Sequence, residues 1–217
     1  MAGGMILLGI FVSKMAIAPA MVLHGASQLT SNASRAFLYR HAIPIRPIAT
    51  YLLGAGIALL ILFHITVALP KQWLYLGLGT MALLAVLIPK VVPLNFARTE
   101  HGLLCGFLNT FVQTLFGVSG PLLELFFVNS GMEKDAIMGT KGLIQTFGHA
   151  GKVAFWLSLE EVNLPLSWIL GVIIAAILGS LFGKKINGIL SERSFRIGYR
   201  AVLGVASVAF LTKGLAY

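Results

Sequence analysis

The chain has 217 residues, of which 58% are hydrophobic and only 11% are charged. A bilayer core takes about 20 apolar residues per helical span, so this composition excludes an ordinary soluble domain and indicates a polytopic α-helical membrane protein. The formal net charge is +9. Most lysines and arginines lie in short predicted loops, where they orient a membrane protein and meet anionic lipid headgroups. We therefore expect the lipid bilayer, and no nucleic acid, as the partner of this charge.

The first half of the chain begins with a short apolar segment, which ends near Pro19, and continues with a helix that is unusually polar. Pro44 and Pro47 then indicate a loop, because proline interrupts a helix interior. In order, the sequence predicts an apolar segment at 3–18, the polar helix at 20–40, a loop at 41–48, spans at 49–69 and 73–88, and a polar connection at 89–101.

The second half contains a similar series of segments. It includes a GVSGP break, in which Ser119 is suited to cap a helix and Pro121 to its first turn. In order, the sequence predicts a span at 102–117, the break at 117–121, a short apolar helix to residue 129, a second polar helix at 134–156, an acidic loop at 158–165, a span at 165–182, a basic segment at 183–196 and a last span at 197–215.

The two polar helices resemble each other. LHGASQLTSNASRAFLYR at residues 23–40 aligns without gaps with TKGLIQTFGHAGKVAFWL at residues 140–157, at a constant offset of 117. The aligned pairs include Gly25 with Gly142, Gln28 with Gln145, and Arg35 with Lys152. The alignment indicates an internal repeat.

The loops after the two polar helices carry opposite charges. Arg40 and Arg46 follow the first, whereas Glu160 and Glu161 follow the second. Basic residues favour cytoplasmic loops, so the equivalent loops face opposite sides of the membrane. We predict an all-α membrane protein with two inverted-topology repeats and about eight hydrophobic helices, some short or broken.

We place the two repeats at residues 1–100 and 101–217. The second repeat has a span before its glycine break, whereas the first begins at its corresponding Gly3-Gly4 break. We therefore expect the first repeat to lack its first helix, as in a sequence truncated at its N-terminus.

Ionisable residues within spans are energetically costly and usually functional. The ionisable residues that we single out in the polar helices are either basic or histidines, which can take up a proton. This indicates an anionic substrate. Two glutamines add amide donors, and a helix that starts after a glycine-rich break points free N–H groups at an anion. The candidate substrate-binding residues are His24, Gln28, Asn32, Arg35, Ser119, Gly120, Lys141, Gln145, His149 and Lys152.

Several of these residues have alternative interpretations. Arg35 and Lys152 lie near helix ends and are suited to reach lipid headgroups. The glutamines are equally suited to join helices. Glu124 is a candidate for carrying a coupling proton, and also for a structural pair with a nearby lysine.

The segment HGASQLTSNASRAFLYR with the following RPI, the GVSGP break and KGLIQTFGH in the second half resemble the TauE/SafE sulfite exporter family. The resemblance implies transport of small sulfur-containing anions, such as sulfite, sulfoacetate or other organosulfonates, across a bacterial inner membrane. By position, it places His24, Gln28, Lys141 and Gln145 near the substrate.

We therefore expect a secondary transporter that moves a small anion by alternating access and needs no cofactor or metal. A coupling ion, either a proton or sodium, and the oligomeric state are left open. One alternative is a membrane-embedded enzyme, for which the chain shows no cluster of His, Cys and carboxylates with ligand spacing. The other is a membrane subunit that does not itself transport.

Overall fold

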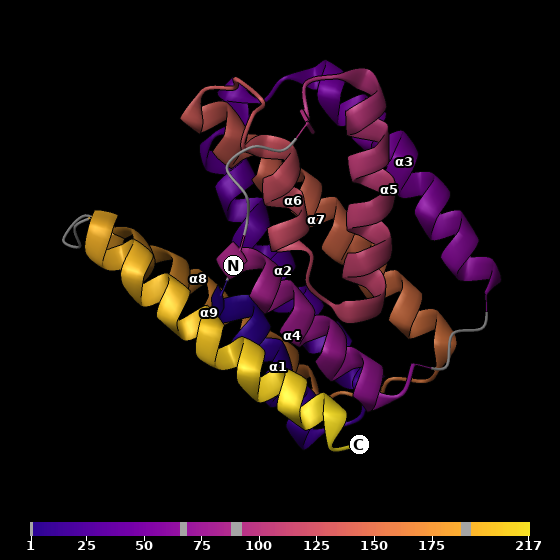
Figure 1. The fold of residues 1–217 in the computed structure, drawn as a ribbon. Helices are drawn as coiled ribbons and strands as arrows, with labels where there is room; N and C mark the ends of the chain where they lie inside the picture. Colours follow the sequence, from indigo (N-terminus) through magenta and orange to yellow (C-terminus); the bar gives the residue numbers. More distant parts are fainter. Residues whose placement is uncertain (1, 66–68, 88–92, 188–191) are drawn as a thin grey trace.

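The computed structural model describes residues 2–65, 69–87, 93–187 and 192–217, and in these ranges every regular element is helical (Figure 1). The all-α prediction is confirmed, with nine α-helices in the described ranges where about eight were expected. They are α1 (Ala2–Lys14), α2 (Ile17–Leu38), α3 (Ile45–His64), α4 (Lys71–Leu87), α5 (Thr99–Phe116), α6 (Gly120–Phe127), α7 (Lys134–Leu159), α8 (Leu166–Asn187) and α9 (Glu192–Leu215), with a 3₁₀ turn, η1, at Arg40–Ala42.

Two prolines that were expected to lie between helices are inside the first turn of a helix. Pro19 is in the first turn of α2, and Pro47 is in the first turn of α3. The first turn of a helix has no intrahelical partner for its N–H groups, so a proline there disrupts no hydrogen bond. The loop predicted at 41–48 is accordingly shorter, and α3 begins at Ile45.

The two expected glycine breaks differ. Gly3 and Gly4 lie within α1, so the break predicted there is wrong. The GVSGP break is confirmed: α5 ends at Phe116, and the next residue, Gly117, has a φ of 78°, in the left-handed region that favours glycine. α6 begins at Gly120, with Pro121 in its first turn.

Only one helix in the described ranges, Ile45–His64, is long and apolar enough to cross a membrane by length and composition. Gly3–Lys14, Lys71–Leu87 and Leu166–Ser180 are shorter apolar helices. α2 and α7 are longer but less apolar, and some of their polar residues, such as His24 and Lys152, contact each other where the two helices pack together, a surface that we call the seam. Part of the predicted connection at 89–101 and part of the basic segment at 183–196 lie outside the described residues.

α2 and α7 pack closely along this seam and run antiparallel. A side chain at Gly25 of α2 would meet His149 and Lys152 of α7, and a side chain at Gly142 of α7 would meet Asn32 and Ala36 of α2. In the alignment of the two repeats at an offset of 117, Gly25 corresponds to Gly142 and His149 corresponds to Asn32. The contact of Gly25 with His149 and the contact of Gly142 with Asn32 are therefore equivalent. The seam therefore repeats itself in the way that inverted repeats require. The division of the chain near residue 100 stays a prediction.

α3 and α5 form a second close pair (Figure 1). A side chain at Gly54 of α3 would collide with the backbone of Leu103 and Phe107, and one at Gly106 of α5 would collide with the backbone of Tyr51 and Ala55. Small residues at such crossings let helix backbones approach closely, which drives packing between membrane helices.

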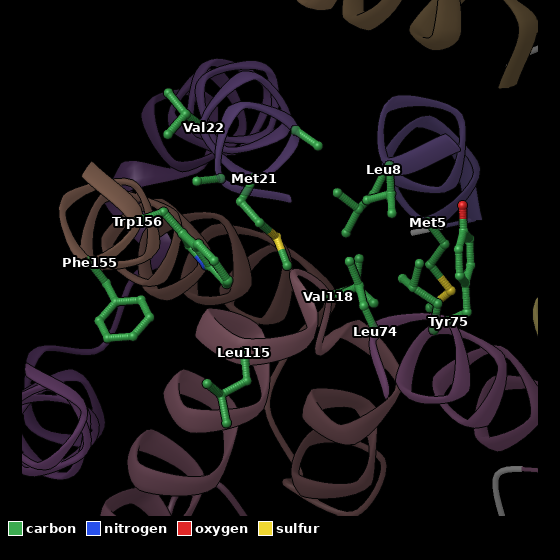
Figure 2. Close-up of a cluster of buried hydrophobic side chains, with 14 of the residues drawn as sticks. Met5, Leu8, Met21, Val22, Leu74, Tyr75, Leu115, Val118, Phe155 and Trp156 are labelled. Atoms are coloured by element: carbon green, nitrogen blue, oxygen red, sulfur yellow. The ribbon is translucent and has the colours of Figure 1, made fainter. Parts of the chain in front are cut away.

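A cluster of buried apolar side chains joins the remaining helices to these pairs (Figure 2). Met5 and Leu8 of α1 lie near Leu74 of α4, while Met21 of α2 points toward Trp156 of α7. Val118, in the break between α5 and α6, lies among them. The break is therefore fixed by packing on several helices at once.

The close crossing of α3 and α5 gives a first prediction. Gly54→Ala should destabilise the protein by about 1–3 kcal/mol, as expected when a methyl group is forced into a packed contact. Gly56→Ala, two residues away and with nothing within 4 Å of the added atom, should change stability little. Thermal unfolding of the two variants in detergent measures this, and equal melting temperatures would contradict the packing described.

Candidate functional site

A cluster of three basic side chains lies buried between α2 and α7. Lys152 Nζ is 2.8 Å from His24 Nδ1 and 3.5 Å from the carbonyl oxygen of Gly117. The ring centroids of His24 and His149 are 5.7 Å apart. His24 and Lys152 have no exposed surface and His149 is 3% exposed. The structure therefore brings together three of the ten residues predicted from the sequence.

Local backbone features position this cluster. Gly25 leaves room for Val153 and for the aliphatic part of Lys152, both of which an added side chain would contact. His149 and Lys152 are three residues apart on α7 and so lie on the same face of the helix. The left-handed Gly117 ends α5 at the point where its carbonyl accepts from Lys152.

The cluster consists of basic side chains and hydrogen-bond donors without a described acidic partner. The only ion pair among the described residues joins Lys141 to Glu124, so no described carboxylate pairs with Lys152. Because an ammonium only donates, His24 Nδ1 must accept, and the neutral ring then carries its proton on Nε2. By distance and angle neither His24 Nε2 nor His149 Nδ1 has a hydrogen-bond partner, although the backbone of Gly4 lies near the His24 ring. Buried charges and unpaired polar groups are costly, so an entering anion would complete this site.

One polar face adjoining the site was not predicted from the sequence, which indicates only an apolar span at residues 102–117. Its members, all on α5 and all fully buried, are Asn109, Thr110, Gln113 and Thr114. They occupy positions i, i+1, i+4 and i+5, which lie on one face of a helix. This helical spacing of polar residues could have identified the face from the sequence.

The α5 face is held partly by hydrogen bonds, and several of its polar atoms, the Gln113 amide nitrogen among them, have no hydrogen-bond partner. Asn109 Nδ2 donates to the Tyr51 hydroxyl at 2.6 Å, and the Ser119 hydroxyl donates to Gln113 Oε1 at 2.9 Å. Gln113 Nε2 has no hydrogen-bond partner and lies against Gly148, next to His149. It is a further donor available beside the basic cluster.

A second group of charges lies at the other end of the α2–α7 seam. Lys141 Nζ is 2.7 Å from Glu124 Oε2 of α6 and 4.9 Å from the centre of the Phe127 ring. Arg35 of α2 is a near neighbour of Lys141 across the seam, because Gly142, the next residue of α7, lies against the backbone of Ala36, the next residue of α2. Lys141 is therefore paired, and the alternative interpretation of Glu124 as the partner of a lysine is confirmed.

The remaining predicted residues have varied surroundings. Gln28 is half-buried against Gly4 of α1, and Asn32 Nδ2 donates to the backbone of Gln28 at 2.8 Å. Gln145 is half-buried. Ser119 occupies the position before α6, but its side chain does not cap that helix, so the capping prediction is wrong: the hydroxyl bonds to Gln113 instead. Gly120 is the buried first residue of α6.

The alternative in which Lys152 reaches the lipid headgroups is wrong. Its side chain is fully enclosed and its ammonium group points to His24 and Gly117. Arg35 is only half-buried.

An all-helical chain whose cationic side chains are enclosed between its helices is typical of membrane transport proteins. The chain belongs to the TauE/SafE family: the family model described as "Sulfite exporter TauE/SafE" matches residues 1–210 of the 217. This is a family of membrane transporters for sulfur-containing anions and not of enzymes. Neither the curated proteins nor the solved structures provide a match.

The burial of Lys152 can be tested chemically. In the folded protein, an amine-acetylating reagent should modify the exposed Lys14 and Lys134 and leave Lys152 unmodified, because no reagent reaches an ammonium group without exposed surface. Mass spectrometry after short labelling, with unfolded protein as the control, measures this. Equal labelling of Lys14 and Lys152 in the folded protein would contradict the structure.

Proposed function

We propose that this protein carries sulfite or small organosulfonates across a bacterial inner membrane by alternating access, and that His24, His149 and Lys152 hold the anion. The observation that supports this best is the buried ammonium of Lys152, which is paired with an imidazole rather than with a carboxylate. An anion in contact with Lys152 would supply the negative charge that the described surroundings lack.

The donors around the cluster suit a sulfur oxyanion. A sulfite or sulfonate group has three oxygens, each of which accepts hydrogen bonds. Lys152 Nζ offers a charged donor, and His24 Nε2 and Gln113 Nε2 are buried donors without partners. Charged hydrogen bonds are stronger than neutral ones, so Lys152 should provide most of the affinity and the neutral donors the orientation.

The burial of the cluster also supports a carrier rather than an open pore. A site that is enclosed on all sides must be opened by movement of helices before an anion can enter or leave. The α2–α7 seam, which carries equivalent residues at its two ends, is a suitable axis for such a movement, since alternating access commonly involves one repeat rocking against the other.

Flux into proteoliposomes tests the function and the site separately. The wild type should transport sulfite or methanesulfonate, whereas Lys152→Met should lose about 10-fold or more, as expected from the loss of a buried charged hydrogen bond worth about 1.5–3 kcal/mol. Lys14→Met makes the same chemical change at an exposed position and should transport normally.

The outcomes are distinct. If the wild type moves neither anion, the proposed function is wrong. If Lys152→Met transports as well as Lys14→Met, the function stands and the assignment of the site is wrong. A thermal melt of each variant shows whether it is folded, and Lys152→Arg, which retains the charge, should keep more flux than Lys152→Met.

A further inference from the structure

The charged groups at the two ends of the seam occupy equivalent positions in the sequence, but only one end has a carboxylate. The offset of 117 pairs His24 with Lys141 and Lys152 with Arg35. The contact between His24 and Lys152 therefore corresponds to the proximity of Lys141 and Arg35. The same offset pairs Glu124 with Leu7 of α1. One end of the seam thus has a carboxylate where the other end has an apolar side chain.

We propose that Arg35 and Lys141 form a second station for the transported anion, and that the Glu124 carboxylate occupies this station until it takes up a proton. The proposal rests on the proposed function, since it concerns the same anion. At the buried end, His24 and Lys152 lack a described carboxylate and await an anion. At the other end, Glu124 is in the place where that anion would bind Lys141.

The charges of this station link the anion to a proton. With Glu124 ionised, Arg35, Lys141 and Glu124 together carry one positive charge. Protonation of Glu124 breaks its ion pair and leaves two positive charges, and a bound monoanion restores one. Because two negative groups at one site disfavour each other, the proton and the anion favour each other's binding. One proton should therefore accompany each monoanion through this station.

The surroundings of Glu124 are consistent with a proton switch. The Glu124 side chain is 29% exposed and that of Lys141 is 14% exposed, so neither group is fully enclosed by the protein. Among the side chains that the structure describes, the titratable and charged groups that act on this pair from other helices are Arg35 of α2, Cys105 of α5 and Tyr199 of α9. A thiol and a phenol are ordinarily neutral near pH 7 and arginine is always charged. Glu124 is therefore the carboxylate whose protonation changes the charge of this group.

Proteoliposomes that contain a pH-sensitive dye test the proposal. In the wild type, an inward gradient of methanesulfonate, whose own charge does not change near neutral pH, should carry protons inward with it. Glu124→Gln mimics the protonated carboxylate, so it should retain anion flux and lose the accompanying proton movement. Glu100→Gln, an exposed position in the first turn of α5, is the matched control and should behave as the wild type.

The pH dependence gives a second readout that holds for whichever anion is transported. The ratio of Glu124→Gln flux to wild-type flux should increase as pH increases, by at most about tenfold per pH unit for one linked proton. The reason is that Glu124 of the wild type deprotonates and blocks Lys141, whereas glutamine does not. Comparing both proteins with the same anion cancels any titration of the anion itself.

Three results would overturn the proposal: wild-type anion flux without proton movement, proton movement that persists in Glu124→Gln, or a flux ratio that is constant with pH. In each case the anion flux itself would leave the proposed function intact, whereas an absence of wild-type flux would contradict that function. If Glu124→Gln does not fold, Glu124→Asp is the variant to measure, and it should retain proton movement because it keeps a carboxylate. Normal anion flux without proton movement in Glu124→Asp would likewise reject the role of Glu124.

Discussion

The close antiparallel contact between α2 and α7 is the interaction on which the rest of the structure depends. Gly25 and Gly142 let the two backbones approach, and the approach buries the polar residues that make these helices less apolar than their neighbours. Lys152 is thereby removed from water and left with an imidazole and a carbonyl as partners. The packing of apolar helices around the seam maintains this costly arrangement, and an anion would relieve it.

The two ends of the seam differ in a way that accounts for both binding and release. A carrier that held its anion equally tightly everywhere could not deliver it. One end lacks a described carboxylate, and the other has Glu124 paired with Lys141. An internal carboxylate that competes with the substrate gives that end a means of rejecting the anion, and its protonation gives a means of accepting it. The carboxylate is present in one repeat only, because the position of Glu124 is occupied by Leu7 in the other.

Much of this arrangement could be predicted from the sequence, because the repeat alignment depends only on residue identity and order. It related the two polar helices and indicated basic residues facing an anion. It could not pair His24 with Lys152 rather than with Lys141, since that depends on the antiparallel direction of two helices far apart in the chain. It also missed Gln113 and Asn109, because a few amides in an apolar run resemble an ordinary span until their burial is known. The helix boundaries near Pro19 and Pro47 were also predicted incorrectly. A proline is compatible with the first turn of a helix as well as with the end of one, and the sequence alone does not distinguish the two positions.

The location of a bound anion tests the central claim most directly. Selenite is a close chemical analogue of sulfite, and its selenium can be located by anomalous scattering in crystals of the protein. Binding by the buried basic cluster predicts a selenium peak within hydrogen-bond reach, about 3–4 Å, of Lys152 Nζ and His24 Nε2. Selenium peaks only at surface lysines, with no peak near Lys152 and His24, would contradict binding by the buried basic cluster.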